Sequence, residues 1–251
     1  MKNRIKKIVC CLVVLFSVNL PAHAGWLDTL ADIKLVDGNG QMQKQLRPAS
    51  GFNEIDLLLP VRIELHQADS EKVEVDADEN LQALIEVAVE NGALQIRPLQ
   101  KRTYPQMKNV AIKVYFKNLA ELRISGAGKV SAPYVNTPGL HLRIGGSGDL
   151  QIQELHTEVL EVHIGGSGNF SAAGSATQID ATIGGSGGLL MDKLAANDVK
   201  VKIGGSGRVR TWAKNTLDVK IGGSGEVRYL GNPQIRQTIG GTGKIVQIAH
   251  E

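Results

Sequence analysis

The five residues Ile144-Gly145-Gly146-Ser147-Gly148 recur, with small changes, through the second half of the chain. Intact copies start at Ile164, Ile183, Ile203 and Ile221, while the flanking copies read Ile124-Ser-Gly-Ala-Gly and Ile239-Gly-Gly-Thr-Gly. Successive copies lie 20, 20, 19, 20, 18 and 18 residues apart. This period is too short for helical repeats, which need about 33 residues or more.

Apolar residues alternate with other residues on both sides of each motif. Around the second copy they are Leu140, Leu142, Ile144, Leu150 and Ile152. Successive side chains of a strand point to opposite faces, so each repeat predicts a strand, a glycine-rich bend and a second strand. One repeat cannot bury its apolar face, whereas stacked repeats form a continuous core. We therefore predict an all-β solenoid of about seven coils, each of 18–20 residues, over residues 121–248.

The glycines of the motif have a predicted structural role. A tight corner needs a positive φ, which glycine reaches without strain. The Ser or Thr inside the motif is predicted to point outward and to stack on its equivalents in neighbouring coils. The motif glycines are Gly145, Gly146, Gly148, Gly165, Gly166, Gly168, Gly184, Gly185, Gly187, Gly204, Gly205, Gly207, Gly222, Gly223, Gly225, Gly240, Gly241 and Gly243.

Residues 50–120 lack the motif but alternate like strands. Apolar alternation runs over 61–65, 73–75, 85–89, 94–96 and 110–116, with Asn91-Gly92 as a hairpin signal. We predict a β-rich region that caps the N-terminal edge of the solenoid, because an open edge invites aggregation. The lead segment, residues 25–49, leaves a short helix or a strand open around Trp26, Leu30 and Ile33.

The first 24 residues are typical of a secretory signal peptide. A basic start is followed by the apolar run Ile8–Val18 and by Ala22-His23-Ala24, a small-x-small cleavage site. The whole chain has 28 basic and 25 acidic residues; without the four basic residues of 1–24, 24 remain and the net charge is −1. That balance does not favour nucleic-acid binding. Both cysteines, Cys10 and Cys11, lie in this segment, so the remainder has no disulfide or Cys-ligated metal. No later stretch could span a membrane.

With these features, the chain resembles the bacterial family of putative auto-transporter adhesin head GIN domains, a domain of unknown function. One matching stretch runs from Phe52-Asn-Glu-Ile55 through Val61–Leu65, Val73–Val75, Glu79–Leu81 and Asn91–Ile96. The other runs from Val114 to Leu119 into Leu122-Arg-Ile124-Ser-Gly-Ala-Gly and the later repeats. Together they cover about residues 50–248. The resemblance implies a right-handed β-helix-like fold on exported or surface proteins, and brings no catalytic residues.

The position before each motif isoleucine is often basic and provides the one candidate ligand-binding stripe. Its members are Arg123, Arg143, His163, Lys202 and Lys220, with Thr182 and Thr238 in between. Such a stripe could bind an acidic polysaccharide or lipopolysaccharide phosphates. The alternative is that it pairs with the neighbouring ladder two residues earlier, which contains Glu121, His141, Glu161, Asp180, Lys200 and Asp218. Alternating charges along a ladder are typical of a solvated, self-compensating face.

Other chemistry finds less support in the sequence. Calcium-binding glycine-rich repeats need a regular aspartate, but the residue after each motif changes charge, from Asp149 to Arg208. Glu161 and Asp180 are candidates for a polysaccharide-active enzyme, which needs two convergent carboxylates. We predict no catalytic site, metal or cofactor. The leading hypothesis is an exported, non-catalytic binding or structural module, periplasmic or at the cell surface, whose partner is a glycan or a protein. The alternatives are the enzyme and a homo-oligomer formed through the C-terminal coil.

Overall fold

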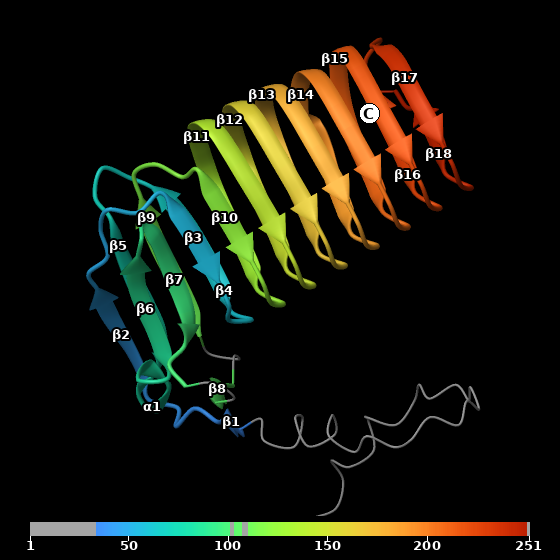
Figure 1. Cartoon of the computed structure of the whole chain (residues 1–251). Helices are drawn as coiled ribbons and strands as arrows, with labels where there is room; N and C mark the ends of the chain where they lie inside the picture. The colour runs from blue at the N-terminus through green and yellow to red at the C-terminus, as the bar shows by residue number, and fades with distance from the viewer. Residues whose placement is uncertain (1–33, 101–102, 107–109, 250–251) are drawn as a thin grey trace, which may run out of the picture. The chain divides into compact units, whose positions relative to one another are not determined.

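The computed structural model describes residues 34–100, 103–106 and 110–249, which belong to one compact unit built almost wholly of strands (Figure 1). The predicted signal peptide and the choice of helix or strand around Trp26, Leu30 and Ile33 lie outside the described residues. Within the part that is described, no helix has the length and hydropathy needed to cross a membrane.

The repeat region forms a β-solenoid, as predicted. Its strands are β10 (Glu121–Ile124), β11 (Lys129–Ile144), β12 (Asp149–Ile164), β13 (Asn169–Ile183), β14 (Gly188–Ile203), β15 (Arg208–Ile221), β16 (Glu226–Leu230), β17 (Gln234–Ile239) and β18 (Lys244–Gln247). Equivalent strands of successive coils pair in parallel, and the motif isoleucines fall opposite one another. Each of β11–β15 bends through an arch at the edge opposite the motif turns (Figure 1).

The core lies between the two strand segments of each coil. In β12 it contains Leu150, Ile152, Leu155, Leu160, Val162 and Ile164, all at most 2% exposed. Equivalent residues of β11, β13, β14 and β15 continue it from coil to coil. Each such side chain contributes roughly 1.5–3 kcal/mol on burial, so the alternation seen in the sequence is the main source of stability.

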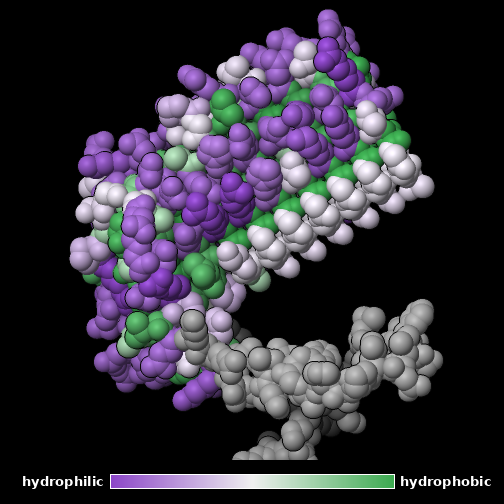
Figure 2. All heavy atoms as spheres, in the orientation of Figure 1, coloured by the Kyte–Doolittle hydropathy of each residue, from purple (hydrophilic) through white to green (hydrophobic). Residues whose placement is uncertain are grey.

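The prediction that the motif glycines need positive φ is wrong. Among the described residues, the glycines with positive φ are Gly40, Gly51, Gly92, Gly174 and Gly231, none of which is in a motif. The motif glycines instead make room for the neighbouring coil. A Cβ on Gly166 would lie 2.2 Å from the carbonyl oxygen of Gly146, and one on Gly168 would lie 2.3 Å from that of Gly148. The coils therefore approach closely along the ridge of small residues at the turn edge (Figure 2).

The first glycine of each motif is under no such constraint. Nothing lies within 4 Å of a Cβ added to Gly165, and the equivalent Gly145 meets only a carbonyl oxygen at 4.0 Å. The degenerate first copy agrees with this, since Ser125 occupies that position. As predicted, the motif serines point outward, and Thr242 Oγ1 donates a hydrogen bond of 3.0 Å to Ser224 Oγ.

The differences in coil length are absorbed at the arch. The register shifts between Ile152 and Leu155, between Ser171 and Ala173, and between Met191 and Ala195 all lie there. Gly174 has φ +121° at the first of these shifts, and its Cβ would lie 2.2 Å from the Leu155 carbonyl oxygen. Glycine is therefore needed for its backbone freedom at the arch, and for its small size at the motif.

One coil of the stack carries no glycine motif. Strands β3 (Glu54–Leu57) and β4 (Arg62–Gln67) pair in parallel with β10 and β11, in the positions of an earlier coil. Residues Leu57–Val61 replace the motif turn, so Gly126 packs on the backbone of Leu59 and Pro60. Residues 50–120 thus continue the sheets of the solenoid.

Further strands complete the predicted capping region. β7 (Ala93–Pro98) and β9 (Ala111–Phe116) add in parallel to β3 and β4. β6 (Ile85–Glu90) pairs antiparallel with β7, β5 (Lys72–Asp78) with β9, and β2 (Met42–Arg47) with β5. The short α1 (Glu79–Gln82) follows β5, and β1 (Lys34–Val36) pairs with β8 (Thr103–Pro105). The five strand predictions for this region are confirmed. The predicted hairpin at Asn91-Gly92 is confirmed too, with φ of 52° and 81°.

Candidate functional site

The candidate stripe lies on the outer side of the strands that lead into the motif turns, here called the pre-turn face. Parallel register places its members directly opposite one another from β10 to β17. We call this line the basic row; it contains Arg123, Arg143, His163, Thr182, Lys202, Lys220 and Thr238. Since their neighbours along the strand point inward, all seven side chains share one face.

A second line, the mixed row, lies two residues earlier on each strand. It contains Glu121, His141, Glu161, Asp180, Lys200, Asp218 and Arg236, again directly opposite one another. Basic and acidic side chains pair at His141–Glu161 (2.9 Å) and at Lys200–Asp180 (3.3 Å), whereas the carboxylates Glu161 and Asp180 lie opposite each other. Cross-strand pairs of opposite charge stabilise a sheet by roughly 0.2–1 kcal/mol each.

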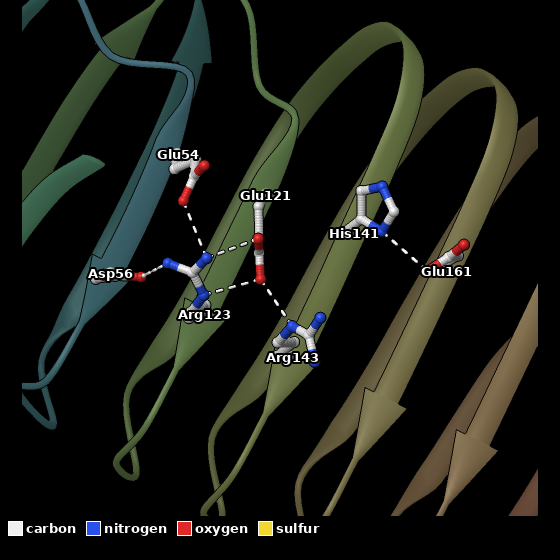
Figure 3. Close-up of polar contacts among 7 residues, drawn as sticks. All are labelled: Glu54, Asp56, Glu121, Arg123, His141, Arg143 and Glu161. Carbon is white, nitrogen blue, oxygen red and sulfur yellow. Dashed lines mark hydrogen bonds and ion pairs between the residues drawn. The ribbon is translucent and has the colours of Figure 1, made fainter. Parts of the chain in front are cut away.

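The N-terminal end of the basic row is neutralised by ion pairs (Figure 3). Arg123 contacts Glu54 and Asp56 at 2.9 Å and Glu121 at 2.7 Å. Arg143 Nε also lies 2.7 Å from Glu121. Burial by itself would raise the pKa of Glu121, but hydrogen bonds from Arg143 and Arg123 outweigh it and lower the pKa. The hydrogen bond to Asp56, with smaller contributions from Glu121 and Glu54, raises the pKa of Arg123.

The C-terminal part of the basic row differs. Within residues 34–249 as described, His163, Lys202 and Lys220 make no ion pair or side-chain hydrogen bond, and Arg236 of the mixed row makes none either. The basic row therefore has two segments. Arg123 and Arg143 are paired with carboxylates, whereas the cations Lys202 and Lys220 face solvent without an acidic partner among the described residues. Sequence alone did not separate the two, because Glu54 and Asp56 belong to the coil that has no motif.

A shallow groove of about 270 Å³ lies beside the unpaired cations. Its polar lining comes from the mixed row and from a third line of residues two positions earlier: Gln178, Asp198, Lys200, Thr216, Asp218, Gln234 and Arg236. Thr216 Oγ1 donates a hydrogen bond of 2.6 Å to Asp198. This third line was not among the predicted candidates, although its residues recur in the sequence five positions before each motif isoleucine.

The two candidate catalytic carboxylates show little of the arrangement that a glycan-cleaving enzyme needs. The candidate carboxylates Glu161 and Asp180 are neighbours, as expected, but each contacts a basic side chain, His141 or Lys200. On the arch, His156 Nδ1 lies 2.9 Å from Ser175 Oγ, and Nε2 lies 2.9 Å from Glu154. The His156 and Glu154 side chains are 41% and 59% exposed, so water competes for both. No group of three or more His, Cys, Asp or Glu residues that could hold a metal ion occurs among the described residues.

Comparison with solved structures shows the same fold elsewhere. A putative adhesin from Bacteroides fragilis NCTC 9343 has a TM-score of 0.80 at 24% identity, over 85% of this chain and 100% of that chain. A putative adhesin from Parabacteroides merdae ATCC 43184 has a TM-score of 0.69 at 25% identity, over 86% and 99%. A putative lipid binding protein from Parabacteroides distasonis ATCC 8503 has a TM-score of 0.70 at 26% identity, over 86% and 100%.

Comparison with curated proteins found no match. A family model does match, over residues 51–233, and its description is "Putative auto-transporter adhesin, head GIN domain". The match covers most of the chain, from the coil without a motif to the arch before β17. It also agrees with the resemblance carried by Phe52–Ile96 and the glycine repeats. The chain therefore belongs to this GIN-domain family of adhesin-type proteins.

Proposed function

We propose that the chain is an exported, non-catalytic binding module of the cell envelope or surface, which binds an acidic glycan on the pre-turn face. The observation that carries the proposal is the division of the basic row. Lys202 and Lys220 have no acidic partner among the described residues, whereas Arg123 and Arg143 have several. Keeping unpaired like charges in one row costs stability, which a polyanionic ligand would recover.

The groove beside these lysines supports a glycan. Its amide, hydroxyl and carboxylate groups, such as Gln178, Thr216 and Asp218, suit sugar hydroxyls, which both donate and accept hydrogen bonds. Rows repeated from coil to coil at the spacing of neighbouring strands, about 4.8 Å, suit a polymer more than a single small molecule. The family's adhesin description is consistent with this role.

The test is a glycan array probed with the chain lacking residues 1–24 and with its Lys202→Glu/Lys220→Glu variant. The control, Lys129→Glu/Lys214→Glu, makes the same charge change at exposed lysines off this face. We expect binding to acidic glycans that falls at least tenfold in the first variant alone, and that weakens with salt. Equal losses in both variants, or no binding, would overturn the proposal.

Lipid vesicles form a second arm of this test, because one similar structure is that of a putative lipid binding protein. Vesicles with and without an anionic lipid are incubated with the same three chains. Binding to vesicles but to no glycan would reject the glycan as ligand, whatever the lysine variants do. Turnover of any glycan on the array would likewise reject the non-catalytic role and favour the enzyme.

A second candidate role, self-association through the C-terminal coil, rests on β17. Ile235 and Ile239 are 41% and 39% exposed, whereas their counterparts in β15, Leu217 and Ile221, are buried. The sequence Ile235-Arg-Gln237-Thr-Ile239 is symmetric about Gln237 in its inward-facing residues. Antiparallel pairing of two copies about Gln237 would therefore place Ile235 of one against Ile239 of the other.

Sedimentation of the chain over a wide concentration range tests this role. We expect a dimer that Ile239→Lys converts to a monomer and that Leu46→Lys leaves intact. Leu46 is 66% exposed on β2, at the opposite edge of the sheet. Disruption by both variants would indicate head-to-tail assembly, and a monomer at all concentrations would exclude self-association altogether.

A further inference from the structure

Asp78 is a buried carboxylate with an unsatisfied oxygen. Its residue is 1% exposed, and Oδ1 has no hydrogen-bond partner. No ion pair or hydrogen bond of its side chain occurs among the described residues. Asp78 is also the N-cap residue of α1, a position where aspartate usually accepts a backbone hydrogen bond, yet it makes none. Burying an unpaired carboxylate is costly, and buried charges are paired or coordinate metals.

The carboxylate points at the loop Asp37-Gly38-Asn39-Gly40-Gln41, which joins β1 to β2. A Cβ added to Gly38 would lie 1.6 Å from Asp78 Oδ2 and 2.5 Å from its Cγ, so the carboxyl group occupies the space beside this glycine. No other described glycine would meet a side chain so closely. The absence of a side chain at position 38 thus lets Asp78 reach the loop backbone.

A second residue after β5 holds the loop over Asp78. Asn80 Nδ2 donates to the Asp37 carbonyl oxygen at 2.8 Å, and Asn80 Oδ1 accepts from the Asn39 backbone nitrogen at 3.0 Å. The Asn39 side chain accepts from the Gln41 backbone nitrogen at 3.1 Å. The Asp37 side chain is exposed and has no ion pair among the described residues. The loop and the segment 78–80 therefore bring carboxylate, amide and carbonyl oxygens together.

We propose that Asp78 and the loop 37–41 bind a divalent cation, and that the cation is calcium. Calcium takes six to eight oxygen ligands and accepts carboxylates, amide oxygens, backbone carbonyls and water in flexible geometry. The buried Asp78 carboxylate, beside a loop that carries Asp37, Asn39 and backbone carbonyls, offers oxygen ligands of these kinds. Magnesium, which needs near-ideal octahedral geometry, fits an irregular loop less well. The sequence predicted no metal site; the site proposed here joins residues about 40 positions apart outside the repeats.

Bound calcium would fix the loop to the β5–α1 junction. This loop precedes β2, the edge strand that pairs antiparallel with β5. The cation would therefore stabilise the end of the sheet opposite the C-terminal coil. It would act independently of the pre-turn face, so failure of the glycan proposal does not affect it.

Thermal unfolding of the full chain tests the proposal, after chelation with EDTA and after titration with calcium or magnesium chloride. We expect a saturable rise in Tm with calcium of about 2–4 °C or more, since about 1 kcal/mol shifts a domain of this length by that amount. Magnesium should produce a smaller rise. Calorimetric titration with calcium chloride provides a direct readout of binding.

Asp78→Asn keeps the shape of the side chain and removes its charge. We expect this variant to lose the calcium response and to match or exceed the Tm of the chelated wild type, because no uncompensated charge is buried. Asp37→Asn, on the exposed side of the loop, should weaken binding about tenfold or more. The control Asp69→Asn changes an exposed aspartate of the β4–β5 turn and should respond like the wild type.

Two results would overturn the site. One is an unchanged Tm and no heat of binding with calcium up to millimolar concentration. The other is an equal calcium response in wild type and Asp78→Asn.

Discussion

At the scale of single residues, the glycines of each motif are of two kinds, which the sequence alone does not distinguish. The second and third glycines of a motif touch the backbone of the preceding coil, whereas the first faces open space. The sequence indicated that glycine mattered at all three positions and suggested backbone conformation as the reason. The true reason, contact between coils, depends on how closely the ridges stack, which no single repeat reveals.

We predict that Gly166→Ala destabilises the fold by about 2–3 kcal/mol or more, because its Cβ would lie 2.2 Å from the Gly146 carbonyl oxygen. Gly165→Ala, in the same motif and with nothing within 4 Å, should change stability by no more than about 0.5 kcal/mol. Urea unfolding of both variants measures the difference. Similar losses would contradict the close-approach account.

The carboxylate of Glu74 gives a prediction about pH. Hydrogen bonds from Lys44 and Lys72, at 2.8 and 3.0 Å, lower the pKa of Glu74 to about 2. Because the folded pKa lies below the ordinary value of 4.5, the stabilisation is fully present above pH 4.5 and is lost as the pH falls through 2. Glu74→Gln should therefore cost about 1 kcal/mol at pH 7, as such pairs do, and nothing well below pH 2.

Urea unfolding of the wild type and Glu74→Gln at several pH values checks this. The difference between the two chains isolates Glu74 from the other acids. Glu158, which is exposed and makes no ion pair or side-chain hydrogen bond among the described residues, provides the control variant Glu158→Gln. A Glu74→Gln difference that stays constant across the acid range would show that the loss is not due to charge.

At the scale of strands, the sequence predicted most of what was needed to place the site. Alternation in the repeats assigned Arg143 and Lys202 to one outer row, and the constant position before each isoleucine aligned them from coil to coil. Of the coil formed by β3 and β4, only β4 was predicted as a strand, and the coil itself was not predicted. Its turn, Leu57–Val61, is apolar and lacks the motif. The acids that neutralise Arg123 lie in that coil, so the division of the basic row could not be predicted.

The hairpin between β6 and β7 depends on its two turn residues. Asn91 and Gly92 have φ of 52° and 81°, the left-handed region that favours glycine and tolerates asparagine. Gly92→Ala should cost about 1–2 kcal/mol, which is the penalty for a Cβ in that conformation. Gly139→Ala, with open space around its Cβ and no positive φ, should be nearly neutral. Thermal unfolding compares the two, and equal Tm values would contradict the turn assignment.

At the scale of the whole described unit, contacts run mainly between neighbouring coils. In such a stack, stability is close to a sum of coil and interface contributions, so a whole coil can be removed without destroying the rest. The pair β11 and β12 suits this change, since they match residue for residue along 14 register pairs without a shift. Both carry a coil of the same length and the same inward pattern.

We predict that deletion of Ile144–His163, which joins Arg143 to Ile164, leaves a folded chain. β11 would then pair with β13, and His141 would face Asp180 in place of Glu161, so the charge pattern is kept. The urea m-value should fall in proportion to the surface that the lost coil buried.

Deletion of Ile144–Val162, which removes one residue fewer, provides the control. It leaves His163 as an extra residue between Arg143 and the motif that starts at Ile164. Since a shift of one residue reverses which side chains face the core, this second chain should be far less stable. Equal stability of the two deletions would mean that the period-two register does not hold the coils in place.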